Sequence, residues 1–103
     1  MTCIDWLVER KLRPVVLVGW SMGSAAVIEA AYLRRHLNAV AAIVTLAAQT
    51  AGTRKAKDLE VPILALHGEA DTVLPAACSK TLAQRAPQVE LHLLPNATHR
   101  MEG

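Results

Sequence analysis

The stretch that decides the fold is residues 15–23, which read Val-Val-Leu-Val-Gly-Trp-Ser-Met-Gly. The four leading apolar residues, three of them β-branched, are typical of a strand buried on both faces. The pattern G-x-S-x-G follows at once and precedes a run of helical composition, so it predicts a strained turn that exposes a serine hydroxyl. We expect Gly19 and Gly23 to leave room where side chains would collide. Ser21 is therefore the candidate nucleophile.

Met22 opens the helix that is expected after Ser21. Its backbone N–H can point at an oxyanion formed when Ser21 attacks a carbonyl. Two alternatives compete with this interpretation. One is an ordinary glycine-rich turn between a strand and a helix. The other is a dinucleotide site, but Gly19 and Gly23 have the spacing G-x-x-x-G instead of G-x-G-x-x-G, and no acidic residue ends a second strand.

The hydrophobic pattern predicts the remaining elements in chain order. Helices are expected over residues 2–13, 24–37 and 75–86, and further strands over residues 39–46, 62–67 and 90–94. In the middle helix, Ala26, Ala30 and Leu33 share the face that we expect to pack on the sheet. This order of strands and helices implies a parallel sheet, which gathers the carboxyl ends of all four strands at one edge.

Three chemically useful side chains follow strands that end at this edge. Ser21 follows the first strand, Asp71 lies in the turn after the third, and His99 lies in the loop after the fourth. Glu69 is the less favoured acid of the same turn, because turns prefer Asp. We expect His67 to brace the turn that holds Asp71 instead of acting as a base.

Two further residues near this edge are candidates for substrate binding. Trp20 precedes the nucleophile, and Gln49 leaves the second strand where ligands of open α/β sheets bind. Ordinary loop polarity explains Gln49 equally well.

Composition excludes several classes of function. With 103 residues, 52% of them hydrophobic, the chain can bury one modest core, as a single domain or part of one. A net charge of +2, scattered basic residues and 3% aromatic content argue against nucleic-acid binding. No apolar run approaches a membrane span. Cys3 and Cys78 show no metal-ligand spacing, and no secretory leader is seen, so we expect reduced thiols and a cytoplasmic setting. The sequence has no cluster of metal-ligating residues, so no metal is implied, and no organic cofactor is implied either.

Three motifs together resemble the α/β-hydrolase superfamily. They are Gly-Trp-Ser-Met-Gly at 19–23, His-Gly-Glu-Ala-Asp-Thr-Val-Leu-Pro at 67–75, and Asn-Ala-Thr-His at 96–99. The middle motif resembles the acid loop H-G-x-x-D-x-x-V/L-P of that superfamily, and the chain is similar to carboxylesterases and dienelactone-hydrolase-like proteins. The resemblance implies a partial α/β-hydrolase fold, with about four parallel strands, flanking helices and no lid. It also implies a serine hydrolase with Ser21 as nucleophile, His99 as general base, Asp71 as its orienting acid, and a small-molecule acyl substrate.

The chain departs from the superfamily at its beginning. The family's sheet normally has several strands before the nucleophile strand, and one of them supplies the second oxyanion donor, whereas only 14 residues precede Val15. We therefore expect residues 1–103 to be the C-terminal portion of such a domain. The first strand would then be an apolar edge, open to a second copy or a partner chain. A non-catalytic interaction module or a truncated inactive fragment is the alternative to the enzyme.

Overall fold

Four strands and two α-helices follow one another as the sequence predicts. The computed structural model describes Ile4, residues 9–10 and residues 14–99, so the helix expected over residues 2–13 lies mostly outside the described residues. The elements are β1 (Val15–Trp20), α2 (Met22–Leu33), β2 (Val40–Leu46), β3 (Ile63–Gly68), α3 (Ala77–Arg85) and β4 (Val89–Leu94), with 3₁₀ turns at Arg35–Leu37 and Arg54–Asp58. The middle helix thus begins two residues earlier than expected and ends in a tighter turn.

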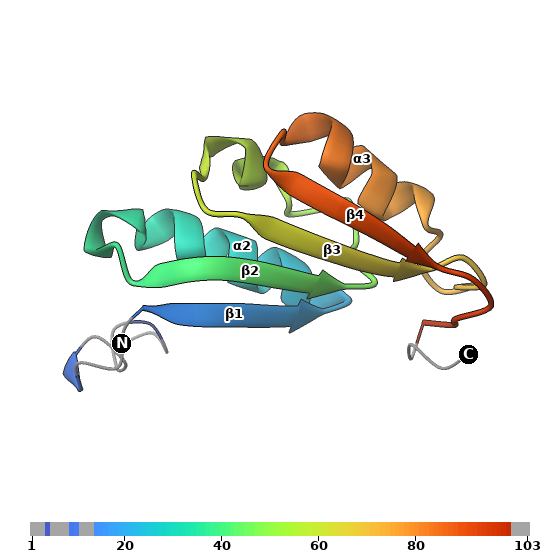
Figure 1. Ribbon diagram of the computed structural model, residues 1–103, viewed down its shortest axis with the longest axis horizontal. Coiled ribbons are helices and arrows are strands. Elements are labelled where there is room, and N and C mark those ends of the chain that lie inside the picture. Colours follow the sequence, from blue (N-terminus) through green and yellow to red (C-terminus); the bar gives the residue numbers. More distant parts are fainter. Residues whose placement is uncertain (1–3, 5–8, 11–13, 100–103) are drawn as a thin grey trace.

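The strands form one parallel sheet in the order β1-β2-β3-β4 (Figure 1). Apolar side chains from α2, β2, β3 and α3 meet in the core between the sheet and the helices. Its members Ile28, Ile43, Ile63 and Leu82 are almost completely buried. The predicted fold class, a partial α/β-hydrolase arrangement of about four parallel strands, is confirmed. Within the described part of the chain, no helix is both long and apolar enough to cross a membrane.

Backbone hydrogen bonds align the carboxyl ends of the strands. The N–H of Ser21, just after β1, donates to the carbonyl oxygen of Leu46 at 2.8 Å. In the same way, the N–H of Ala47 after β2 donates to the carbonyl oxygen of Leu66 at 2.8 Å. The N–H of Glu69 after β3 donates to the carbonyl oxygen of Leu94 at 3.0 Å. The residue after each of β1, β2 and β3 is therefore bonded to a carbonyl at or near the end of the next strand. This ladder sets the loops that leave the strands side by side along one edge.

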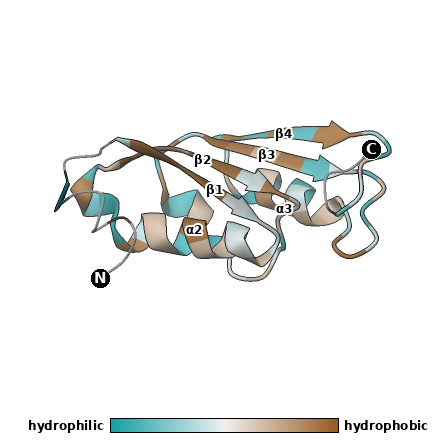
Figure 2. Ribbon diagram, turned by 90° about the horizontal axis from the view of Figure 1, so that it is seen from below, coloured by the Kyte–Doolittle hydropathy of each residue, from teal (hydrophilic) through white to brown (hydrophobic). Residues whose placement is uncertain are grey.

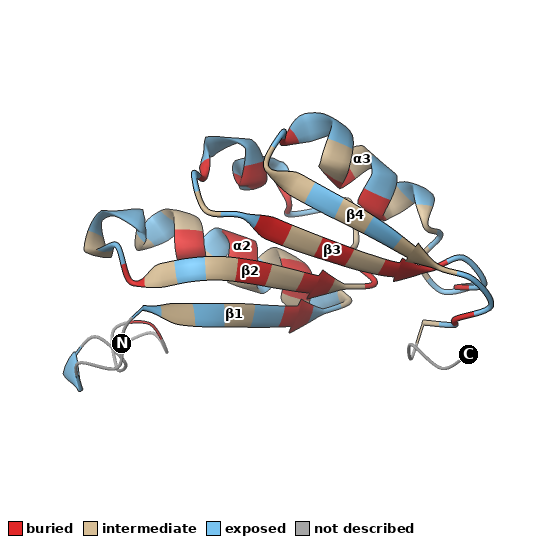
Figure 3. Ribbon diagram, viewed as in Figure 1, coloured by how far each residue is buried: buried red, intermediate tan, exposed pale blue. Residues whose placement is uncertain are grey.

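Both α-helices lie on the same face of the sheet (Figure 2). The side chains of Val16 and Val18 on the other face of β1 are 56% and 59% exposed, and burial alternates along β1 and β2 (Figure 3). The expectation that β1 is buried on both faces is therefore wrong. An apolar run predicted the strand correctly, but the described helices cover only one side of it.

The packed face of α2 also differs from the expected one. Its buried residues are Ser24, Ile28 and Ala31, whereas Ala26 is exposed and Leu33 is 52% exposed. The expectation based on Ala26, Ala30 and Leu33 is therefore wrong. Because α2 is apolar on nearly every side, the spacing of its apolar residues could not decide which side faces the sheet.

Candidate active site

Ser21 stands on a tight turn between β1 and α2. Its dihedral angles, φ 55° and ψ −120°, belong to the first central position of a type II′ turn, where glycine is usually required. Ser21 also occupies the N-cap position of α2, yet its side chain makes no capping hydrogen bond. Instead, its Oγ lies 2.9 Å from Nε2 of His99. The turn thus directs the hydroxyl away from the helix and toward the histidine.

The two glycines of the motif have different surroundings. A Cβ added at Gly19 would lie 2.6 Å from the carbonyl carbon of Gly23 and 2.7 Å from the Cα of Ser24. The same addition at Gly23 would meet nothing within 4 Å. The steric expectation is confirmed for Gly19 and wrong for Gly23. Only the first glycine is required by the approach of strand and helix, which the buried hydrogen bond from Ser24 Oγ to the Gly19 carbonyl reinforces at 3.1 Å.

Asp71 is held in the turn that follows β3. Its Oδ1 accepts hydrogen bonds from the backbone N–H groups of Val73 and Leu74, at 2.9 and 2.8 Å. Its Oδ2 lies 2.8 Å from Nδ1 of His99. The side chain of Asp71 is fully buried, whereas Glu69, the other acid of the turn, is exposed. The acid loop therefore presents Asp71, and not Glu69, to the histidine.

Opposing effects act on the carboxyl group of Asp71. Burial raises its pKa, but the hydrogen bonds from His99 and from the backbone N–H groups of Leu74 and Val73 outweigh it. The pKa of Asp71 consequently lies below its ordinary value of 3.8. Asp71 is a carboxylate at neutral pH. Because a carboxylate only accepts hydrogen bonds, Nδ1 of His99 carries the proton and Nε2 is left free to accept from Ser21.

His67 braces the acid loop, as the sequence predicted, and also connects it to α3. Its Nε2 lies 2.8 Å from the carbonyl oxygen of Leu74, and its Nδ1 lies 2.6 Å from Oγ of Ser79. A carbonyl only accepts, so Nε2 carries the proton and Nδ1 accepts from the Ser79 hydroxyl. The same Nε2 lies 3.3 Å from Oδ2 of Asp71, and both side chains are fully buried. His67 thus fixes the turn that holds the acid.

His99 reaches the site from the loop that follows β4. This loop is bonded to the acid loop, since the N–H of Ala70 donates to the carbonyl oxygen of Ala97 at 3.0 Å. Gly68 makes this approach possible, because a Cβ there would lie 2.6 Å from the Ala97 carbonyl carbon. This steric requirement at Gly68 was not among the predictions from the sequence. A glycine inside the H-G-x-x-D motif was the available signal.

The remaining candidate residues are Met22, Gln49 and Trp20. Met22 begins α2, so its backbone N–H belongs to the first turn, where a helix leaves its amides without internal partners; its side chain is 73% exposed. Gln49 is partly buried, and its side-chain amide donates to the carbonyl oxygen of Ala51 at 3.0 Å. Trp20 is 49% exposed, and its indole N–H donates to the carbonyl oxygen of His99 at 2.8 Å.

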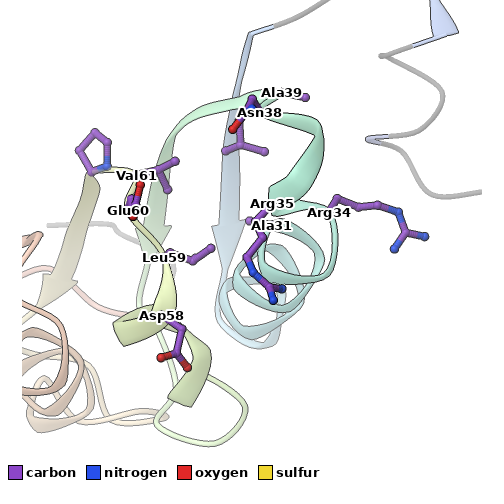
Figure 4. A pocket seen from close by; sticks show the side chains of 11 residues that line it. Ala31, Arg34, Arg35, Asn38, Ala39, Asp58, Leu59, Glu60 and Val61 are labelled. Atoms are coloured by element: carbon purple, nitrogen blue, oxygen red, sulfur yellow. The ribbon is translucent and has the colours of Figure 1, made fainter.

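A cavity of about 540 Å³ opens at the opposite end of the sheet (Figure 4). It is lined by the end of α2 and the starts of β2 and β3, including Arg35, Asn38 and Asp58. Ser21, Asp71 and His99 are not part of it, and they lie at the rim where the strands end. The part of the chain that the structure describes contains no cluster of three or more His, Cys, Asp or Glu residues placed to hold a metal ion.

A parallel sheet with a serine on a strained turn after β1, an acid after β3 and a histidine after β4 is the arrangement of an α/β hydrolase. The sequence profile of the dienelactone hydrolase family matches residues 3–101. The chain therefore belongs to the dienelactone hydrolase family. No curated protein sequence matches it.

Solved structures show the same fold. A CIB-like hydrolase from Thermoplasma acidophilum is similar with 26% identity and a TM-score of 0.78, over 92% of this chain and 46% of that one. The esterase domain of a Rhodothermus marinus protein is similar with 18% identity and a TM-score of 0.83, over 97% and 57%. An α/β serine hydrolase homologue from Coxiella burnetii has 23% identity and a TM-score of 0.79, over 92% and 46%. The chain thus spans about half the length of these structures.

Proposed function

We propose that this protein is a serine hydrolase that cleaves carboxylic ester or related acyl bonds of a small-molecule substrate through Ser21, His99 and Asp71. The observation that supports the proposal is the hydrogen-bonded row from Ser21 Oγ to His99 Nε2 at 2.9 Å and from His99 Nδ1 to Asp71 Oδ2 at 2.8 Å. A serine hydroxyl is a weak nucleophile at neutral pH, so it needs an adjacent base, and the base needs a group that orients it.

In the proposed reaction, Oγ of Ser21 attacks the substrate carbonyl while Nε2 of His99 takes the hydroxyl proton. The tetrahedral intermediate then expels the leaving alcohol, which receives that proton from His99, and an acyl-enzyme remains on Ser21. Water attacks the acyl group with His99 again as the base, and release of the acid restores Ser21. Asp71 keeps the imidazole in the correct tautomer and stabilises its cationic form.

The proposed oxyanion donor is the backbone N–H of Met22. It follows the nucleophile directly and stands in the first turn of α2, where the helix dipole also favours negative charge. One such donor contributes on the order of 10² to 10³ in turnover. Because the donor is a backbone group, changing the Met22 side chain does not remove it. Substitutions at the neighbouring glycines, which can move the backbone, test it more directly.

A fluorophosphonate probe tests the proposal on the 103-residue chain. The probe forms a covalent bond only with an activated serine, so we expect one adduct, located at Ser21 by peptide mass spectrometry. Ser21→Ala and His99→Gln should abolish the adduct. Thr81→Ala is the matched control, because among the described residues its hydroxyl bonds only to the Ala77 carbonyl on α3. Absence of labelling in the folded wild-type chain would refute the proposed reaction.

A second candidate function is suggested by the outer side of β1. This strand stands at one edge of the described sheet, and Val16, Val18 and Trp20 on it are about half exposed. An apolar edge of this kind suits strand addition by a second copy or a partner chain, without catalysis. A Val18→Lys substitution separates the two functions. It should weaken self-association in sedimentation experiments if β1 is an interface, and it should leave fluorophosphonate labelling unchanged in the enzyme.

A further inference from the structure

Trp20 contacts the histidine of the site in two ways. Its indole N–H donates to the backbone carbonyl oxygen of His99 at 2.8 Å. Its ring also faces the imidazole, with the two ring centroids 5.3 Å apart and the planes tilted by 39°. A tryptophan that only lined a substrate site would not need to donate its indole N–H to the main chain of His99. The pair of contacts therefore points to a role in placing His99.

The loop that carries His99 needs such a contact. Within the described residues, the loop is bonded at Ala97, whose carbonyl accepts from the N–H of Ala70, while Thr98 is exposed. The hydrogen bond from Trp20 fixes the main chain two residues beyond Ala97. Asp71 and Ser21 bond to the two imidazole nitrogens, and Trp20 bonds to the backbone carbonyl of the same residue. His99 is therefore held at three points.

Trp20 is also the residue directly before the nucleophile. It ends β1, while the N–H of Ser21 is fixed to the carbonyl oxygen of Leu46. One rigid strand end therefore carries both the nucleophile and the anchor for its base. Any displacement of this strand end would move Ser21 and the indole of Trp20 together. The distance of 2.9 Å between Ser21 Oγ and His99 Nε2 would therefore be kept.

We propose that Trp20 is a positioning residue that holds His99 against Ser21 through its indole N–H and its ring. This inference rests on the proposed function, because it gives Trp20 a task in the same reaction. It predicts a loss in kcat, not in substrate affinity. A residue that only formed a wall of the substrate site would behave differently, because removing it raises KM and leaves kcat unchanged.

The sharpest variant changes only the N–H group. Incorporating β-(3-benzothienyl)alanine in place of tryptophan keeps the shape of the ring and replaces N–H by sulfur. Since the chain has two tryptophans, the reference is the Trp6→Phe protein, in which position 20 alone is replaced. Loss of one hydrogen bond of ordinary strength should lower kcat about tenfold for p-nitrophenyl acetate, with KM within about twofold. Trp20→Phe should behave alike, and Val18→Ala on the same exposed side of β1 is the control.

A second measurement needs no turnover. In Trp6→Phe, Ser21→Ala protein, one indole ¹H–¹⁵N resonance remains, and its chemical shift should report the hydrogen bond to the residue 99 carbonyl and the neighbouring imidazole ring. His99→Gln removes that ring and should move the resonance, while the backbone carbonyl of residue 99 stays in place. Unchanged kcat in the isosteric variant, a rise in KM alone, or an indole resonance that ignores His99 would each overturn the inference. An indole resonance that responds to His99 in a chain without hydrolysis would refute the proposed function and leave the contact intact.

Discussion

A Gly19→Ala substitution, which adds a single methyl group, tests whether the turn at Ser21 requires a glycine before it. The Cβ of a Gly19→Ala variant would lie 2.6 Å from the carbonyl carbon of Gly23 and 2.7 Å from Ser24 Cα. Real Cβ atoms essentially never approach closer than 3.0 Å and ordinarily stay beyond 3.4 Å. The carbonyl oxygen of Gly23 lies closer still, so the start of α2 must move by roughly half an ångström to one ångström relative to β1.

This movement has a cost in both stability and rate. Overpacking of backbone against a new methyl group typically costs about 1–3 kcal/mol. Ser21 lies between the two glycines, so the same shift disturbs its 2.9 Å hydrogen bond to His99. Because a misplacement of about 1 Å can lower the rate on the order of 100-fold, we expect a loss on the order of 10- to 100-fold.

Gly23→Ala is the matched control, because a Cβ there meets nothing within 4 Å. Alanine is the better helix former, so this variant should keep the wild-type stability or gain up to about 1 kcal/mol. The assay combines urea unfolding with the rate of fluorophosphonate labelling. If both variants unfold at the same urea concentration and label at the same rate, the steric reasoning about the turn is refuted.

Three further predictions concern the acid and its loop. Asp71→Asn should lower turnover on the order of 10⁴-fold, because His99 would then adopt the wrong tautomer; an unchanged rate would assign the acid elsewhere. The lowered pKa of Asp71 means that its carboxylate adds stability in full well above pH 3.8, and this contribution is lost as the pH falls through the folded-state pKa. Urea unfolding between about pH 6 and pH 2 should therefore show a flatter acid limb for Asp71→Asn than for the wild type, and parallel curves would contradict the hydrogen bonding described. Gly68→Ala should separate the acid and histidine loops, because its Cβ would lie 2.6 Å from the Ala97 carbonyl carbon, and should lower labelling more than Gly23→Ala does.

The order of elements could be predicted because each strand is a short apolar run bounded by turn residues. The strand expected over residues 39–46 begins one residue before β2 and ends with it. The strand expected over residues 62–67 begins and ends one residue before β3. The positions of Ser21, Asp71 and His99 after the first, third and fourth strands predicted that they meet at one edge, since parallel strands bring their carboxyl ends together. The distances between these side chains agree with that placement.

Other features depend on contacts that the sequence does not encode locally. Val16 and Val18 have the composition of a buried strand, but α2 and α3 cover only the other face of the sheet. The packed side of α2 was missed because apolar residues surround the helix. The contact of Trp20 with the backbone of His99 joins positions 79 residues apart, and no local pattern signals a bond to a main-chain carbonyl.

Ser21 shows why the motif could predict a turn but not how the turn is held. The left-handed φ of 55° costs a non-glycine residue on the order of 1–3 kcal/mol, and the unused N-cap forgoes about 1 kcal/mol more. Nothing within residues 15–23 offsets these costs. The bonds that do so come from elsewhere in the chain, through the Leu46 carbonyl to the Ser21 N–H and through His99 to the hydroxyl. Ala47, with φ 53° directly after β2, is held in the same way by Leu66. Strain therefore gathers at the edge of the sheet where the ladder bonds end, and the reactive conformation of Ser21 is a property of the whole sheet.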